Sequence, residues 1–486
     1  MPHANSGILT LDIGSTYTKG ALVDAAAHRI IARFATPTTV DHLPRGVATV
    51  LHALFPDRIP AGNADLDGVR LDLPAHLSCS AKGGLKVTAV GLVPELTLSV
   101  ARQVVCSAGG KISGAYAFEL TPDDIETIRR DNPDIILLAG GTDGGNAVYA
   151  RKNARRLAEA SLPATVVFAG NRAVAPELPA LFPDGRLIVT ENVMPEFGQL
   201  NIEPARREIR NLFLRRLIEG KGLSRVVEVF GGEPKPTPRA VLELVERLAA
   251  TSPEWEDTLL IDMGGATTDV YSNSPAVAAG DGVILRGIPE PAVKRTVEGD
   301  LGMRVSSRSV LASGGTLLER LRDTAGVAAG ELERHTALLT EQPGRLPADS
   351  REELLDRLLA TACVALSVGR HAGTIEESWT PGGKVFLQRG KDLRRIRTII
   401  GSGGYLAATP DTTLYRDALE AAAAPSTDGR LALLPSSPRL LRDSEGLLPL
   451  LGNLASPYPA LASHLARAGL TELAPRSNHQ QTSEGA

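Results

Sequence analysis

The chain has little cysteine: its three residues, Cys79, Cys106 and Cys363, lie far apart. This spacing supplies neither a CxxC metal site nor a disulfide framework, and it favours a reducing cytoplasm as the compartment. Uninterrupted apolar runs of about 18 residues are also missing, as is a basic N-terminus followed by an apolar core. We therefore expect neither a membrane span nor a signal peptide, and we expect Cys79 and Cys106 to be small core residues.

Aromatic residues make up only 4% of the 486 residues, and the formal net charge is −4. This charge gives no reason to expect nucleic acid or an anionic membrane as a partner. Glycine, in contrast, occurs 48 times, which favours tight turns over aromatic stacking platforms. The length predicts two to four domains at roughly 100–200 residues each.

Apolar segments alternate with amphipathic helical segments in the middle of the chain. "PDIILLAGG" (133–141), "ATVVFAGN" (164–171) and "GRLIVTEN" (185–192) are typical of buried parallel strands. Glycines follow the first two strands at their carboxyl ends, where open α/β sheets bind ligands. The loop "GGTDGG" around Asp143 is therefore either a second ligand site or a glycine-rich loop needed for close packing.

Two segments share a strand–turn–strand pattern, "DIGSTYTK" at 12–19 and "DMGGATTD" at 262–269. Each opens with an aspartate after an apolar strand and turns through glycine into small hydroxyl residues. Glycine lets backbone N–H groups approach phosphate oxygens, hydroxyls add donors, and a carboxylate can hold Mg²⁺ through water. Ordinary β-hairpins are the alternative. The second copy and the strand-to-glycine run "IIGSGG" (399–404) favour phosphate binding.

The three segments resemble, in order, the phosphate-1, phosphate-2 and adenosine motifs of the actin/Hsp70/sugar-kinase ATPase superfamily. The resemblance implies an α/β fold in which two RNase H-like lobes clamp Mg-ATP, with ATP and Mg²⁺ as cofactors. It implies that Asp12 and Asp262 bind the metal and that Asp262 is also catalytic, since it would orient the attacking water. The implied nucleotide-binding residues are Asp12, Gly14, Ser15, Thr16, Lys19, Gly264, Gly265, Ala266, Thr267, Gly401, Gly403 and Gly404.

Longer strings make a narrower resemblance. "CSAKGGLKVTAVGLVPELT", "LLAGGTDGGN", "TENVMPEFGQLNIEPAR" and "KRTVEGDLGMR" resemble the MutL family, also called GlmL, over residues from about 8 to about 470. The members of this family are accessory proteins of adenosylcobalamin-dependent mutases such as glutamate mutase. The resemblance implies a reactivating chaperone with ATPase activity, which opens the mutase so that damaged cobalamin leaves. It implies a mutase subunit as partner and allows a homodimer.

The predicted organisation has four parts. Residues 1–113 form the first ATPase lobe, 114–225 an inserted α/β domain, 226–475 the connector and second lobe, and 476–486 a disordered tail. The helix expected over 237–250 fits the place of the connector between the lobes. The inserted domain is the natural candidate for the element that meets the mutase.

Two other functions fit the same motifs. A small-molecule kinase would need a general base near the γ-phosphate, a role in which Asp269 could serve. A scaffold that binds nucleotide without turnover is the third function, and the presence of both Asp12 and Asp262 argues against it.

Two further segments have alternative interpretations. "KRTVEGDLGMR" either contacts the nucleotide or relays its state, or is a solvated helix start with charge pairs. Its charged residues are Lys294, Arg295, Glu298, Asp300 and Arg304. The segment 351–373 places Leu355, Leu358, Leu359, Ala362 and Leu366 on one face of a helix. We expect His371 to be a capping cation at the end of this helix.

Overall fold

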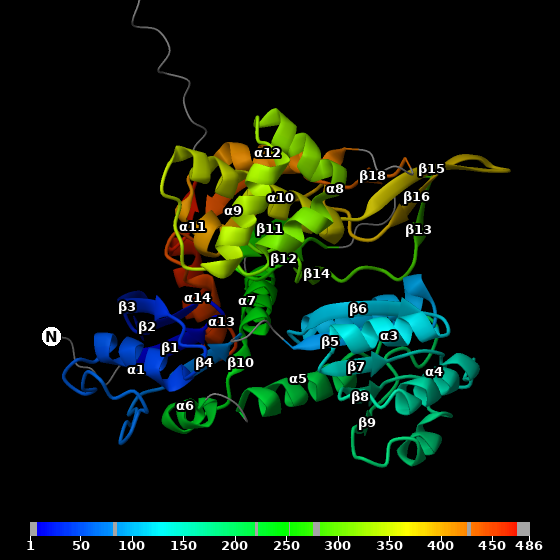
Figure 1. Ribbon diagram of the computed structural model, residues 1–486, viewed down its shortest axis with the longest axis horizontal. Helices are drawn as coiled ribbons and strands as arrows, with labels where there is room; N and C mark the ends of the chain where they lie inside the picture. The colour runs from blue at the N-terminus through cyan, green and yellow to red at the C-terminus, as the bar shows by residue number, and fades with distance from the viewer. Residues whose placement is uncertain are drawn as a thin grey trace, which may run out of the picture.

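The computed structural model describes residues 7–80, 85–218, 222–251, 253–275, 282–424 and 429–473. The tail predicted at 476–486 lies outside the described residues. Within them, four sheets are arranged in two lobes, an inserted domain and a small projecting sheet (Figure 1).

The first lobe is built on a five-stranded sheet with the order β10-β4-β1-β2-β3. Strands β1, β2 and β3 form an antiparallel meander. Strand β4 pairs in parallel with β1, and β10 pairs in parallel with β4. The elements of this lobe are β1 (Gly7–Ile13), β2 (Tyr17–Asp24), β3 (Arg29–Pro37), α1 (Leu43–Leu54), β4 (Ala75–Cys79), α6 (Leu223–Phe230) and β10 (Lys235–Pro236).

The second lobe repeats this topology in the order β14-β12-β11-β17-β19-β20. Here β11, β12 and β14 form the meander, and β17 and β19 run parallel to β11. Its sheet and flanking helices are α7 (Thr237–Thr251), η3 (Pro253–Trp255), β11 (Thr258–Met263), β12 (Thr268–Asn273), β14 (Val293–Glu298), α8 (Ser307–Thr324), α9 (Ala329–Glu341), α10 (Ser350–His371), β17 (Thr398–Ser402), α11 (Gly404–Ala408), α12 (Thr412–Ala423), β19 (Arg439–Arg442), α13 (Leu448–Leu454), α14 (Pro459–Ala468) and β20 (Thr471–Glu472). The second sheet adds one antiparallel strand, β20, but its other five strands follow the order of the first sheet, so the predicted twin-lobe α/β fold is confirmed.

The inserted domain has a parallel sheet with the order β6-β5-β7-β8-β9, which is a doubly wound arrangement. Its elements are β5 (Lys86–Gly91), η1 (Pro94–Leu98), α2 (Ser99–Ser107), β6 (Lys111–Ala117), α3 (Pro122–Asp131), β7 (Ile135–Leu138), α4 (Val148–Glu159), β8 (Thr165–Phe168), η2 (Ala175–Ala180), β9 (Leu187–Val189) and α5 (Glu203–Ile218). The boundary predicted between residues 113 and 114 is wrong. It falls inside β6, and β5 already belongs to this sheet.

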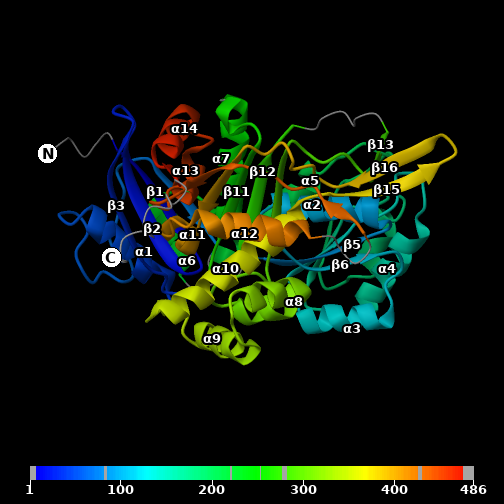
Figure 2. The same ribbon diagram turned by 90° about the horizontal axis from the view of Figure 1, so that it is seen from above.

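A fourth, smaller unit projects from the second lobe over the inserted domain (Figures 1 and 2). It is a four-stranded sheet in the order β13-β16-β15-β18. Its strands are β13 (Val283–Arg286), β15 (Thr374–Thr380), β16 (Gly383–Arg389) and β18 (Leu431–Ala432). Trp379, at the end of the β15–β16 hairpin, is 75% exposed.

The two lobes meet at α7 and α13, which pack against each other between the sheets (Figure 1). One hydrophobic cluster includes Ile8 and Val23 of the first sheet and Leu260 and Ile400 of the second. The connector helix predicted over 237–250 is therefore present as α7. Because its apolar face packs against both sheets, a change in the lobe angle must move this helix.

Helix α10 forms where the apolar pattern predicts it. Asp349 caps its N-terminus by accepting from the backbone N–H of Glu352 at 2.8 Å. Leu355, Leu358, Leu359 and Ala362 are buried in the largest core of the second lobe, and Leu366 packs against it. The helix thereby anchors α8 and α12 on the second sheet.

Candidate nucleotide site

Asp12 lies at the carboxyl end of β1 and is 3% exposed. Its Oδ1 accepts hydrogen bonds from Ser78 Oγ at 2.8 Å and from Thr237 Oγ1 at 2.5 Å. Burial raises the pKa of Asp12, although Thr237, Lys19 and Ser78 act in the opposite direction. The carboxylate is thus held rigidly by β4 and by the first residue of α7.

The two predicted hairpins have the same turn geometry. The Gly14 N–H donates to Tyr17 O at 3.0 Å, and the Gly264 N–H donates to Thr267 O at 2.9 Å. A Cβ atom on Gly265 would lie 3.3 Å from Thr16 Oγ1, so the tips of the two turns face each other. Ser15 is exposed. The two turns oppose one another as a nucleotide clamp requires.

Asp262 lies at the same position of β11 as Asp12 does of β1. Its pKa is raised to about 7 by burial and then by the charge of Asp269, with smaller contributions from Asp443 and Asp12. Lys19 acts in the opposite direction. The site therefore gathers several carboxylates around one cation, Lys19. A bound Mg²⁺ would reduce the repulsion among these carboxylates.

Asp443 is a third carboxylate of this site, and sequence reasoning missed it. It is buried and accepts from the backbone N–H groups of Leu447 at 2.8 Å and Leu448 at 3.0 Å. Burial raises its pKa, while those N–H groups and Lys19 lower it. A Cβ atom on Gly446 would lie 3.2 Å from Lys19 Nζ, so Lys19 spans from the first lobe to this turn of the second.

The raised pKa of Asp262 predicts a pH dependence of stability. The usual value of 3.8 holds in the unfolded chain, so the folded state keeps a proton that the unfolded state releases between about pH 4 and 7. The free energy of unfolding should therefore fall by about 2 kcal/mol between pH 5 and 7 because of this group. Urea unfolding of the wild type and of Asp262→Asn at several pH values measures it. Equal slopes in both proteins would contradict the assignment.

The donor set fits Mg-ATP. Within the described residues no group of three His, Cys, Asp or Glu side chains is close enough to hold a metal by itself. Mg²⁺ is usually held by one or two carboxylates together with substrate phosphates and waters, so Asp12 and Asp262 suffice. The backbone N–H groups of the turns and Lys19 would face the phosphates.

The three glycines of the adenosine segment have different surroundings. A Cβ atom on Gly401 would lie 1.9 Å from the Tyr415 hydroxyl, and one on Gly403 would lie 2.2 Å from Met263 O. These two glycines allow close packing inside the second lobe. At Gly404 nothing lies within 4 Å, so of the three only Gly404 leaves the open space that a nucleoside needs.

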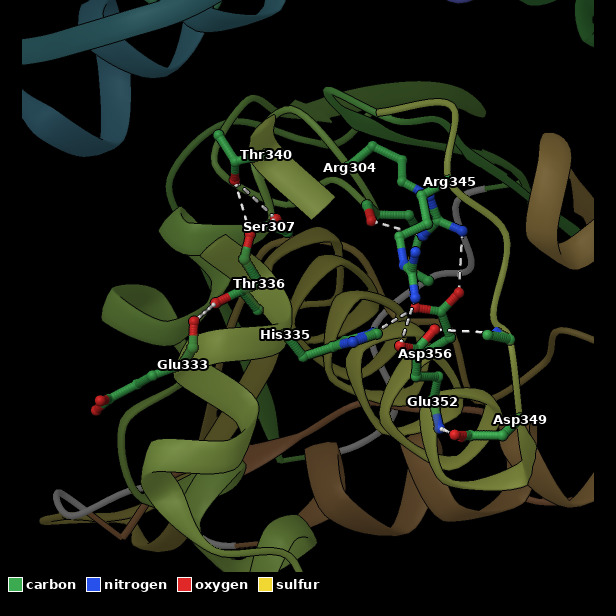
Figure 3. A network of polar contacts seen from close by, with 12 residues as sticks. Arg304, Ser307, Glu333, His335, Thr336, Thr340, Arg345, Asp349, Glu352 and Asp356 are labelled. Carbon is green, nitrogen blue, oxygen red and sulfur yellow. Dashed lines mark hydrogen bonds and ion pairs between the residues drawn. The ribbon is translucent and has the colours of Figure 1, made fainter. Parts of the chain in front are cut away.

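Arg304 is the charged residue of the "KRTVEGDLGMR" segment that lies at the second turn. Its backbone N–H donates to Gly265 O at 2.9 Å, and its Nη2 pairs with Asp356 at 2.9 Å. Figure 3 shows Arg304 and His335 meeting at Asp356, where His335 Nε2 lies 2.8 Å from Oδ1. His335 comes from α9 and Asp356 from α10, so this network joins the second turn to both helices.

Residues 294–298 of that segment belong to strand β14, contrary to the alternative of a solvated helix start. Arg295 on β14 is 1% exposed at its side chain and holds Asp269 at 2.5 Å. Lys294 pairs with Glu290, and Glu298 and Asp300 both pair with Arg370. Because Arg295 already neutralises it, Asp269 is not a free general base for a kinase reaction.

The expectation that His371 is a capping cation is wrong. The ring is fully buried between two hydroxyl groups, with Thr296 Oγ1 at 2.8 Å from Nδ1 and Ser272 Oγ at 2.8 Å from Nε2. Burial, helped by Lys294 and Lys391, lowers its pKa well below the usual value. The residue is a neutral link between α10 and the sheet.

The "GGTDGG" loop is closed by its own packing. A Cβ atom on Gly141 would lie 2.1 Å from Asn146 O, and one on Gly170 would lie 2.8 Å from Gly140 O. Asp143 accepts from the Arg172 N–H and from Asn192 Nδ2, both at 2.9 Å. These contacts favour the packing interpretation of the loop. Cys79 and Cys106 are buried, as expected.

Comparison with known proteins places the chain in a family. The model of the MutL protein family matches residues 8–470. Protein MutL of Clostridium tetanomorphum is 36% identical over 473 residues, which are 96% of this chain and 99% of that protein. The chain belongs to the MutL family. The resemblance seen in the sequence strings is thereby confirmed.

Solved structures give weaker likenesses. Nucleotide-free acetone carboxylase has a TM-score of 0.37 at 12% identity, covering 93% of this chain and 70% of its own. A glycerol dehydratase reactivase has a TM-score of 0.33 at 10% identity, and the match covers 93% of this chain and 100% of the reactivase. Ligand-bound xylulose kinase from Lactobacillus acidophilus has a TM-score of 0.33 at 10% identity, and the match covers 96% of this chain and 92% of the kinase.

Among the described residues, no helix has the length and apolar character needed to cross a membrane.

Proposed function

We propose that this protein is a Mg-ATP-dependent reactivating chaperone for an adenosylcobalamin-dependent mutase, glutamate mutase or a related enzyme. Membership of the MutL family, together with the two opposed aspartate–glycine turns, is the observation that carries the proposal. Hydrolysis would convert a clamp held by the γ-phosphate into one with a different lobe angle. The mutase would use that change to release damaged cobalamin.

The residues divide into roles under this proposal. Asp12, fixed by Ser78 and Thr237, holds the metal side of the nucleotide. Lys19 neutralises phosphate charge between the lobes, and Asp262 orients water. The Asp262 carboxylate can also accept a proton from that water.

The segment 299–306 connects the second turn with the inserted domain. Met303 N–H donates to Gly264 O at 3.1 Å, and Ser306 Oγ donates to Ala266 O at 2.7 Å. At its other end, Lys111 Nζ of β6 donates to Gly299 O at 2.9 Å. A shift of the turn would therefore pass directly to the inserted domain, which is the proposed mutase-facing element.

Lys111→Met tests this connection. Because Lys111 lies on β6 of the inserted domain and donates to Gly299 O rather than to the second turn itself, ATP hydrolysis should stay within about twofold of the wild type, while the effect of ATP on mutase binding should fall at least about fivefold. Lys152→Met, on the outer surface of the same domain and paired with Glu119, is the matched control. Parallel loss of hydrolysis in Lys111→Met would contradict the relay.

The proposal as a whole is tested with a mutase inactivated by bound cyanocobalamin. Addition of the protein, Mg-ATP and fresh adenosylcobalamin should restore mutase activity, and a non-hydrolysable ATP analogue should not. The client is found beforehand by pull-down from native extract with and without Mg-ATP. If no mutase is recovered, and if ATP turnover instead requires one metabolite, the proposal fails in favour of a kinase.

A further inference from the structure

The small projecting sheet has one mainly apolar face. Residues that are paired across neighbouring strands point to the same side of a sheet, so the register of β13, β15, β16 and β18 assigns each side chain to a face. Three apolar side chains on this face are strongly exposed, Trp379 by 75%, Leu285 by 51% and Leu431 by 50%. The residues Val283, Leu285, Ile375, Trp379, Phe386 and Leu431 form this apolar face.

The opposite face of the sheet is fastened to the inserted domain. There Glu376 pairs with Arg389 at 3.6 Å and with Arg430 at 3.0 Å. Arg389 also pairs with Glu95 of η1, in the inserted domain, at 3.2 Å. The apolar face therefore points away from the inserted domain, and the tip of the β15–β16 hairpin reaches out beyond that domain (Figures 1 and 2).

Within the part of the chain that the structure describes, no second layer covers the apolar face. None of its six residues belongs to, or packs against, a hydrophobic cluster of the lobes or of the inserted domain. Sheets normally bury an apolar face against a second layer, and exposed apolar patches commonly mark interaction sites. A partner that supplies this layer is therefore expected.

The charges beside the apolar face select the partner. Glu377 and Lys384 lie on the same side of the sheet near the hairpin tip, 2.7 Å apart, and are 59% and 42% exposed. Because this side carries one charge of each sign, it is complementary to itself about a two-fold axis, where Lys384 of each copy meets Glu377 of the other. Two sheets of equal twist also pack well face to face, as in a β-sandwich.

We propose that two copies of this chain pack their apolar faces together, so that the two projecting sheets form a two-layer sandwich. Trp379 is the anchor, since it is the largest and most exposed side chain of the face. The strands of the sheet have at most seven residues, so the contact is small and the dimer should be weak, with a Kd of roughly 10–100 μM. This inference does not depend on the proposed function.

Sedimentation velocity of the full chain without nucleotide, from about 1 to 300 μM, tests the dimer and should show a monomer–dimer equilibrium. Trp379→Ser should raise the Kd at least about tenfold, because it removes the anchor. Phe197→Ser is the matched control. Phe197 is 78% exposed but lies between β9 and α5 of the inserted domain, so its loss should leave the Kd unchanged.

Exchange of the two charges tests whether the partner is a second copy. Lys384→Glu alone and Glu377→Lys alone place like charges opposite each other, and each variant should dimerise at least about fivefold more weakly than the wild type. An equimolar mixture of the two variants should recover dimers, because every facing pair then has opposite signs.

A chain that is monomeric at all concentrations, a dimer that Trp379→Ser leaves intact, or a mixture no tighter than its components would each overturn the proposal. A monomeric chain that loses mutase binding on Trp379→Ser would assign the apolar face to the client instead.

Discussion

Asp262→Asn should lower the rate of ATP hydrolysis by roughly 10²–10⁴-fold and should weaken Mg-ATP binding less than Asp12→Ala does. The carboxylate at this position lies at the end of β11, at the turn opposite Asp12, where it can orient water and accept its proton. Asparagine keeps the shape and the hydrogen-bonding oxygen but cannot accept a proton. Phosphate release measures the rate, and a fluorescent ATP analogue measures binding.

Two variants complete this experiment. Asp12→Ala should weaken Mg-ATP binding roughly tenfold or more, because it removes the carboxylate that Ser78 and Thr237 hold in place. Asp323→Asn, at an exposed site on α8, should leave both quantities unchanged. Equal loss of binding in the Asp12 and Asp262 variants would contradict the division of roles. Unchanged mutase reactivation by Asp262→Asn would favour the non-hydrolysing scaffold.

Arg295→Met should lower the free energy of unfolding by about 3–5 kcal/mol. The Arg295 side chain is almost completely buried, where it holds Asp269 and donates to Cys106 O of the inserted domain. It also lies over the Tyr271 ring at 5.9 Å. Its loss leaves the buried Asp269 carboxylate without a counter-charge. Urea unfolding measures the change.

The double variant Arg295→Met/Asp269→Asn separates charge from packing. It should recover most of the lost stability, because no uncompensated carboxylate remains. Arg308→Met removes an arginine whose ion pair with Glu341 is exposed, and it should change stability by no more than about 0.5 kcal/mol. If the single and double Arg295 variants are equally unstable, packing and the Cys106 contact account for the loss.

The two aspartate–glycine turns could be predicted because their sequence pattern is local. The aspartate, the glycine and the hydroxyl residues are neighbours in the chain, so their pattern is visible without any knowledge of folding. Helix α10 is similar, since its apolar face follows from spacing alone. The family resemblance could be predicted for the same reason, since it rests on short sequence strings, and the family model matches nearly the whole chain, residues 8–470.

The start of the inserted domain could not be predicted in the same way. The strands β4 and β5 are consecutive in the chain, yet β4 pairs with β1 and β5 with β6 and β7. An alternation of apolar and polar residues indicates that a segment is a strand, but it does not indicate which sheet the strand joins. That choice depends on partners far away in the sequence.

The sequence by itself determined the α/β class, the two aspartate–glycine turns and the family. Only the tertiary structure brought Ser78, Thr237 and Asp443 to those turns, because each comes from a different element with no motif of its own. It also made His371 neutral and raised the pKa of Asp262, since burial and neighbouring charges set a pKa. Side-chain identity is local information, whereas solvation and proximity exist only after the chain has folded.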